Sequence, residues 1–256
     1  MNILLYEPKY TYARGNTIAL ALRKIATYHK IKKDFVVYFN KQITSEVLFL
    51  FGNKKIDLIY ITTLFTYDLK TIINSVKSIR RFSNAEIKIG GIASTLMPDY
   101  VQKETGITPM IGLWEEVEKL IPDYSQIFPE VNNAMCFTTR GCIRNCGFCA
   151  VRKLEPKFHI SQNWKEQITA TRKAKIKRLS IQDNNFLAAP WDHQKEVIKY
   201  LSEDMGNFFE IDFNQALDCR LFTIKKGLLL SKIRIPRFRF AFDSIKEKRL
   251  FRSNLL

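Results

Sequence analysis

Short apolar runs of strand length alternate with segments of helical periodicity along almost the whole chain. In the first half, the segments between the runs carry apolar residues at spacings of three and four, which is typical of amphipathic helices. Such β/α alternation favours a parallel sheet with helices on both faces. We therefore predict an α/β fold that begins with a Rossmann-like, doubly wound parallel sheet. Its predicted strands are Ile3–Tyr6, Phe35–Phe39, Asp57–Ile61 and Glu86–Ile89.

The alternation is interrupted at residues 122–133, where Pro122 and Pro129 suit a linker between domains. Residues 1–121 are expected to form one domain and residues 134–256 a second one. The second domain shows the same alternation and holds about four β/α units. Its predicted strands are Ala134–Thr138, Arg178–Gln182, Glu210–Asn214 and Arg237–Ala241, and its last helix is predicted at 245–256.

The charge of the chain permits contact with polyanions but does not require it. Lys and Arg number 41 against 25 Asp and Glu, which gives a formal net charge of +16. A charge of this size suits a nucleic-acid surface. Lys, Ile and Asn are also abundant throughout, as an AT-rich coding sequence would supply without any selection for RNA binding. Both explanations stay open at this point.

The chain shows no sign of export or of a membrane span. No apolar run reaches the ~18 residues of a transmembrane helix. The segment Met1–Tyr10 contains Glu7 and Lys9 and has no basic stretch before an apolar one, so it predicts a first strand and not a signal peptide. We expect a cytoplasmic protein with no membrane partner.

Three of the five cysteines crowd into one loop directly after a predicted strand. Cys142, Cys146 and Cys149 fall as C-x3-C-x2-C within the segment TTRGCIRNCGFCAV. An odd number of cysteines without an export signal argues against a disulfide framework and for a metal or redox site. Three thiolates on one short loop suit an iron–sulfur cluster or zinc.

The number of local ligands favours a cluster over zinc. A four-iron cluster bound by three cysteines keeps one iron without a protein thiolate, and a small molecule can bind there. A structural zinc site needs four protein ligands, which leave no open coordination position. The fourth would have to be Cys136, Cys219 or His159, and none of these has a familiar zinc spacing.

The cysteine loop resembles the signature of the radical S-adenosylmethionine (SAM) superfamily. The aromatic Phe148 before the last cysteine and the preceding TTRGC carry the resemblance. It implies that Cys142, Cys146 and Cys149 hold a [4Fe–4S] cluster whose open iron chelates SAM. It also implies reductive cleavage of SAM to a 5′-deoxyadenosyl radical, with an electron donor such as flavodoxin or ferredoxin. The backbone near Phe148 would contact the adenine.

The resemblance extends to the later strand ends of the second domain. It implies that Asp183, in the turn after the second strand, meets the SAM amino group. For Asp183 a simple turn and helix-cap role is the alternative. The resemblance also implies SAM contacts from polar residues at the third and fourth strand ends, where Arg220 would pair with the SAM carboxylate. These candidates are Asn214, Arg220 and Asp243.

One feature departs from the family. The radical SAM core usually has six β/α units, and the sequence predicts about four, so we expect a partial barrel. Three explanations follow: the chain is a fragment, a partner chain completes the barrel, or the protein is a reduced relative. A half-open barrel would expose a sheet edge and apolar surface.

A Rossmann-like domain before this core resembles the cobalamin-binding class of the superfamily. Thr62, in the segment TTLFT, and the pair Gly90-Gly91 fit cobalamin-contacting positions after the strands. The D-x-H-x-x-G motif that supplies a cobalt-binding histidine is absent, and His29 lies in a predicted helix. The alternative is a degenerate scaffold that shapes the active site without cobalamin.

Two functions remain after the sequence has been considered. The first is a radical SAM enzyme, or its N-terminal portion, acting on an unidentified small molecule, peptide or RNA. The second is a non-catalytic iron–sulfur or zinc module that binds nucleic acid through a basic surface. Cleavage of SAM separates the two.

Overall fold

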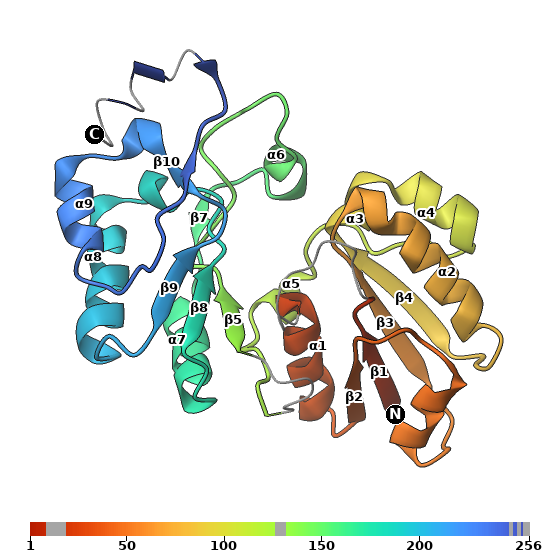
Figure 1. Cartoon of the computed structure of the whole chain (residues 1–256). Helices are drawn as coiled ribbons and strands as arrows, with labels where there is room; N and C mark the ends of the chain where they lie inside the picture. Colours follow the sequence, from red (N-terminus) through yellow and green to blue (C-terminus); the bar gives the residue numbers. More distant parts are fainter. Residues whose placement is uncertain (9–18, 126–131, 246–247, 250–251, 253–256) are drawn as a thin grey trace. The chain divides into compact units, whose positions relative to one another are not determined.

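The computed structural model describes residues 1–8, 19–125, 132–245, 248–249 and 252, which are drawn in colour in Figure 1. The chain divides into two compact units, Met1–Val131 and Asn132–Leu256. Much of the predicted linker at 122–133 and of the predicted last helix at 245–256 lies outside the described residues.

The first unit is built on a four-stranded parallel sheet in the order β2-β1-β3-β4 (Figure 1). Its strands are β1 (Asn2–Tyr6), β2 (Phe35–Phe39), β3 (Leu58–Thr63) and β4 (Glu86–Gly91). Its helices are α1 (Leu20–Ile31), α2 (Leu69–Ile79), α3 (Ile92–Leu96), α4 (Pro98–Thr105) and α5 (Glu115–Glu118). Two short 3-10 helices, η1 (Ser45–Phe51) and η2 (Thr66–Asp68), complete it.

Alternate residues of the strands bury against opposite helical layers. On one face Leu4 and Ile59 pack with residues of α2 and α4, and on the other Ile3 and Leu5 pack with residues of α1. Both faces of the sheet are therefore apolar, as the continuous runs in the sequence require. The predicted doubly wound, Rossmann-like sheet is confirmed.

The second unit contains a three-stranded parallel sheet in the order β5-β8-β9. The unit also has two separate two-stranded sheets. Strands β6 and β7 pair antiparallel, and strands β10 and β11 pair parallel. Its strands are β5 (Asn133–Cys136), β6 (Thr139–Arg140), β7 (His159–Ile160), β8 (Arg178–Ile181), β9 (Glu210–Phe213), β10 (Leu217–Asp218) and β11 (Phe240–Ala241).

Helices follow these strands in the manner of a partial β/α barrel (Figure 1). They are α6 (Val151–Leu154), α7 (Trp164–Lys173), α8 (Trp191–Lys199) and α9 (Ile224–Leu230), with 3-10 helices η3 (Phe186–Ala188) and η5 (Cys219–Leu221) and a π-helical turn η4 (Tyr200–Asp204) that continues α8. The predicted α/β class, with a partial barrel in the second unit, is confirmed. None of the helices that the structure describes is long and apolar enough to cross a membrane.

Candidate functional site

The cysteine loop begins at β6 and returns at β7. The antiparallel pairing of Arg140 with His159 closes the segment that contains Cys142, Cys146 and Cys149. All three thiols are free and partly exposed. The backbone N–H of Cys149 donates to the carbonyl of Cys146 at 3.1 Å, which makes a turn between these two cysteines.

Gly141 sets the direction of the loop as it leaves β6. Its φ of +71° lies in the left-handed region, and a Cβ at this position would lie 2.3 Å from the carbonyl oxygen of Lys157. Its N–H donates to Glu155 Oε2 at 2.8 Å, and the other oxygen of Glu155 pairs with Arg140 at 2.9 Å. A glycine and one buried ion pair therefore fix the two ends of the loop.

Asp183 fastens the segment before the cysteine loop to the end of β8. It is 3% exposed. Its Oδ1 accepts a hydrogen bond from the backbone N–H of Thr138 at 2.6 Å. Its Oδ2 accepts from the hydroxyls of Thr138 at 2.5 Å and Thr139 at 2.9 Å. Both carboxylate oxygens are thus engaged by the chain, and the predicted contact of Asp183 with SAM stays a prediction.

Burial raises the pKa of Asp183 from 3.8 to about 6, although the hydrogen bonds from Thr138 and Thr139 act in the opposite direction. Because the folded-state pKa is above the unfolded value, the folded state is favoured when the carboxyl is protonated. This contribution is complete below pH 4 and is lost as the pH rises through about 6.

Asp183→Asn is expected to remove this pH dependence. One pKa unit corresponds to about 1.4 kcal/mol. As the pH rises from 4 to 7, the unfolding free energy of the wild type should therefore fall by about 2–3 kcal/mol relative to that of the variant. Urea unfolding of the metal-free chain in a Trp114→Phe background measures this, since the remaining tryptophans, Trp164 and Trp191, belong to the second unit. If the unfolding free energies of the two proteins changed in parallel with pH, the raised pKa of Asp183 would be incorrect.

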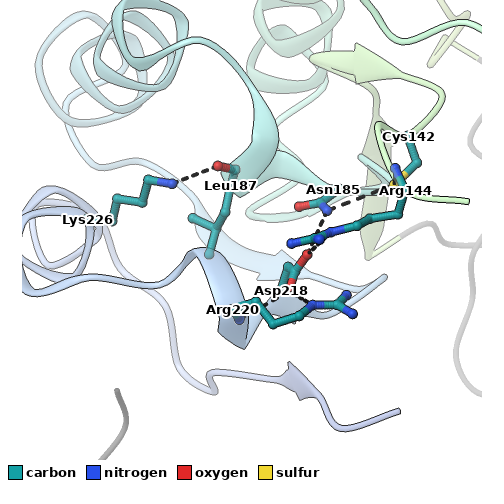
Figure 2. Close-up of polar contacts among 7 residues, drawn as sticks. All are labelled: Cys142, Arg144, Asn185, Leu187, Asp218, Arg220 and Lys226. Carbon is teal, nitrogen blue, oxygen red and sulfur yellow. Dashed lines mark hydrogen bonds and ion pairs between the residues drawn. The ribbon is translucent and has the colours of Figure 1, made fainter. Parts of the chain in front are cut away.

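A second carboxylate, Asp218 at the end of β10, joins the cysteine loop to two other segments (Figure 2). Its Oδ2 accepts hydrogen bonds from Arg144 Nε and Asn185 Nδ2, each at 3.1 Å. Its Oδ1 accepts from Arg220 Nε at 2.6 Å. Asn185 Nδ2 also lies 3.9 Å from Cys142 Sγ, and the Arg144 backbone N–H donates to that sulfur at 3.3 Å. Cys142 is therefore held through two residues that share one carboxylate.

Asp218 stays ionised in this setting. Burial alone would raise the pKa of Asp218, but hydrogen bonds from Arg220 and Asn185 and the charge of Arg220 outweigh it, so its pKa lies below the ordinary value. A carboxylate between two guanidinium groups keeps both oriented. The arrangement places fixed positive charge next to the position of a thiolate ligand.

Asn185 leaves one buried acceptor without a donor. The side chain is 4% exposed, and its Oδ1 accepts no hydrogen bond from any residue that the structure describes. The amide orientation is fixed because Nδ2 must donate to the Asp218 carboxylate. A buried carbonyl oxygen without a donor costs free energy, which a bound group with an N–H donor would recover.

The remaining predicted SAM contacts lie on separate segments. Phe148 is 74% exposed in the cysteine loop. Asn214, directly after β9, is exposed and its Nδ2 donates to Gln182 Oε1 at 3.4 Å. Asp243 is exposed after β11. Among these residues, Arg220 is linked through Asp218 to Arg144 and Asn185, which contact Cys142. The SAM contacts of Phe148, Asp183, Asn214, Arg220 and Asp243 all stay predictions.

Asn185 and Asp218 are site residues that the sequence does not reveal. They lie 33 positions apart and meet only because β8 and β10 end near each other. The available signals were weak: Asn185 follows the candidate Asp183, and Asp218 directly precedes a buried cysteine and Arg220.

The donor set fits an iron–sulfur cluster. Within the described ranges, no three His, Cys, Asp or Glu side chains converge closely enough to hold a single metal ion. The ligands of a four-iron cluster bind separate irons and need not meet at one point. Three free thiols on one loop, with the backbone N–H of Arg144 donating to Cys142 Sγ, suit such a cluster. Cys136 and Cys219 are fully buried elsewhere in the unit.

The predicted cobalamin-contacting residues lie at the carboxyl ends of two neighbouring strands in the first unit. Thr62 pairs with Gly90, and Thr63 with Gly91. Gly91 has a φ of +116°, and a Cβ there would lie 2.4 Å from the carbonyl oxygen of Thr63. The close approach of β3 is therefore a sufficient reason for glycine at this position. Cobalamin contact by Thr62, Gly90 and Gly91 stays a prediction.

His29 is the single histidine in residues 1–131, and both of its ring nitrogens are engaged. Nδ1 lies 2.7 Å from Asp34 Oδ2, and Nε2 lies 3.1 Å from the hydroxyl of Tyr60. The ring is 4% exposed. The described part of this unit therefore offers no free imidazole to a cobalt ion.

Comparison with solved structures identifies proteins of the same fold. TsrM from Kitasatospora setae, a radical S-adenosylmethionine methyltransferase solved with tryptophan substrate and the SAM analogue aza-SAM bound, matches with a TM-score of 0.73 and 13% identity over 92% of this chain. TsrM solved with cobalamin and a [4Fe–4S] cluster bound matches with a TM-score of 0.74 and 14% identity over 97% of this chain. The chain shares the fold of the matched part of TsrM. The resemblance predicted from the cysteine loop is confirmed at the level of fold.

The match does not extend to the whole of TsrM. This chain spans 58% and 62% of the length of the two TsrM chains. No protein-family model matches the sequence, and no curated protein does. At 13–14% identity the likeness concerns the fold, and the ligands named for TsrM belong to TsrM.

Proposed function

We propose that this chain is a radical SAM iron–sulfur protein in which Cys142, Cys146 and Cys149 hold a [4Fe–4S] cluster and SAM is the cosubstrate. The observation that carries the proposal is the network around Cys142, because it combines a C-x3-C-x2-C loop with a fixed polar surround. The fold shared with TsrM supports it. When bound, the cluster supplies an open iron that chelates SAM and an electron that cleaves it.

The residues of the chain have distinct tasks in this proposal. Gly141 and Glu155 fix the ends of the cysteine loop. The backbone N–H of Arg144 and Nδ2 of Asn185 place hydrogen-bond donors at the sulfur of Cys142. Asp218 orients the side chains of Arg144 and Asn185. Donors of this kind stabilise the thiolate form and influence the reduction potential of a cluster.

Asn185 also suits the cosubstrate. The amino group of SAM is an N–H donor, and Asn185 Oδ1 is a buried acceptor without one among the described residues. We infer that this oxygen, and not the fully engaged Asp183, accepts from the SAM ammonium group. Arg220, already oriented by Asp218, is then a candidate on this network for the SAM carboxylate.

SAM turnover tests the function directly. The chain is reconstituted with iron and sulfide without oxygen, then mixed with dithionite and SAM. Formation of 5′-deoxyadenosine and methionine is the expected result, and S-adenosylhomocysteine is measured in the same sample because methyl transfer would release it. The same treatment of Cys149→Ala provides the matched control, for which at least about a tenfold lower yield is expected.

The outcomes separate the two functions left by the sequence. A reconstituted cluster with neither SAM binding nor SAM turnover would overturn the enzyme proposal and favour the non-catalytic module. In that case RNA binding would be measured next, and phosphate contacts would make it fall steeply with salt. A stoichiometric single zinc ion in the anaerobically purified chain would overturn both the cluster and the SAM chemistry.

A further inference from the structure

A hollow lies between two outer helices of the second unit, on elements that carry no part of the cysteine site. Helix α8, continued by η4, runs next to α9 (Figure 1). Between them is a hollow of about 720 Å³. It follows α8 and η4 from Trp191 to Ser202, about 16 Å at the rise of a helix. The hollow is therefore an elongated groove; we call it the α8–α9 groove.

The groove has an apolar lining that is open to water. Trp191 and Ile198 contribute from α8, and Ile224 and Leu228 from α9. Ile224 is 84% exposed and Leu228 is 65% exposed, and they lie one helical turn apart on the same face of α9. Adjacent large apolar side chains with this exposure are typical of a surface that a partner covers.

Lysines surround this apolar lining. Lys195, Lys199, Lys225 and Lys232 all line the groove, and Glu203 is the single acidic residue among its lining. Lys225 Nζ lies 4.4 Å above the ring of Trp191, so one cation sits directly over the apolar surface. A partner must therefore present apolar side chains and negative charge together.

The walls of the groove are fixed to the same segment of the chain. Lys226 of α9 donates from Nζ to the carbonyl of Leu187 at 2.8 Å (Figure 2). Gln194 of α8 donates from Nε2 to the carbonyls of Leu187 and Ala189, at 3.2 and 2.7 Å. Both helices are thus anchored to η3 and the residue after it. Binding would find the groove already formed and would not have to order its walls.

We propose that the α8–α9 groove binds an acidic amphipathic helix of a partner protein. The apolar face of such a helix would fill the groove between Trp191, Ile224 and Leu228. Lys195 already pairs with Asp192 at 2.8 Å, so flanking carboxylates would meet Lys199, Lys225 and Lys232. A second copy of this chain is disfavoured because it carries a net charge of +16. Nucleic acid would satisfy the lysines but would not cover the exposed isoleucine and leucine. This site is independent of the proposed SAM chemistry.

A set of helical peptides of graded charge tests the proposal. All four peptides carry the same face of Leu and Phe. Their flanking positions give net charges of about −6, −2, +2 and +6, so that only the charge differs between them. Binding of each peptide to the chain of residues 1–256 is followed by fluorescence anisotropy. The most acidic peptide should bind with a dissociation constant below about 100 µM, and affinity should fall in the order of increasing positive charge.

Two variants locate the site, and two matched variants serve as controls. Leu228→Ser and the pair Lys199→Glu with Lys232→Glu should each weaken binding of the acidic peptide at least about tenfold. Ile31→Ser, at a residue that is 67% exposed in the first unit, matches the first variant. Lys173→Glu with Lys177→Glu, at exposed lysines outside the groove, matches the charge change of the second. Neither control should alter binding more than about twofold.

Several results would overturn the proposal. These are failure of the acidic peptide to bind, equal affinity for all four peptides, and equal loss in groove and control variants. Vesicles that contain phosphatidylserine are tested in parallel. Vesicle binding that depends on Leu228, together with no peptide binding, would replace the helix with an anionic membrane surface as the occupant.

Discussion

Replacing Cys146 with alanine is expected to abolish retention of the iron–sulfur cluster. Cys146 is the middle one of the three proposed ligands, and its backbone carbonyl accepts a hydrogen bond from the N–H of Cys149 in a turn. Without its thiolate, two local cysteines would have to hold a cube of four irons, and no other cysteine lies on this loop. Changes around metal ligands already cost tenfold to a hundredfold in affinity, so loss of a ligand should lower bound iron at least about tenfold. Iron and sulfide analysis after anaerobic reconstitution and desalting measures this.

Cys219→Ala is the matched control because it removes a thiol outside the loop. Cys219 is 1% exposed and lies in η5, and we expect it to serve as a small buried side chain. Iron and sulfide content should stay within about 20% of wild type. The free energy of unfolding should fall by only about 1 kcal/mol. Equal loss of iron in both variants would show that the cluster assignment to the loop is incorrect.

The strands could be predicted because their signal is local. Phe35–Phe39 has the same bounds in sequence and structure, since a short apolar run between polar segments specifies a strand. Strand β4 extends past the predicted Ile89 to Gly91, because the pairing with Thr62 and Thr63 continues the ladder through both glycines. Glycine weakens a strand when taken alone, so this extension depended on a neighbour that the local pattern does not contain.

The fourth strand of the second unit shows the limit of the same reasoning. The alternating pattern of Arg237–Ala241 predicts a full strand, but only Phe240 and Ala241 pair, and they pair with β10. Upstream, Arg239 forms an ion pair with Asp212, and Ile211 donates to the carbonyl of Arg234. The segment thus meets β9 through single contacts and not through a ladder. Whether an alternating segment forms a ladder depends on a partner distant in sequence.

The residues of the candidate site also fall into two groups, those that the local sequence predicts and those that meet only in the folded chain. The three cysteines and the glycine before them are local in sequence, and their spacing identified them. The network that surrounds Cys142 is not local: Asn185 and Asp218 follow different strands and meet through a hydrogen bond between their side chains. Asp183 stood out in the sequence as an acidic residue after a strand, yet its carboxylate is engaged by Thr138 and Thr139. Burial decides between binding and structural roles for such a residue, and burial is not visible in one sequence.

Gly141→Ala is expected to have the largest effect of any glycine-to-alanine replacement in the described part of the second unit. The residue has a φ of +71°, which costs an alanine about 1–2 kcal/mol. The new Cβ would also lie 2.3 Å from the oxygen and 2.7 Å from the carbonyl carbon of Lys157, both of them backbone atoms that cannot rotate away. The pairing of β6 with β7 would have to open. We expect a loss of about 3 kcal/mol or more in unfolding free energy and, with it, loss of the cluster.

Gly147→Ala separates this backbone effect from a general sensitivity of the loop. Gly147 lies between Cys146 and Cys149, does not have a positive φ, and a Cβ there would meet no atom within 4 Å. Its replacement should change unfolding free energy by no more than about 0.5 kcal/mol and leave iron content unchanged. Urea unfolding and iron analysis of both variants give the comparison. If Gly141→Ala kept its iron and its stability, the β6–β7 closure would not be what positions the cysteines, and the loop would have to be organised from Asp218 and Asn185 alone.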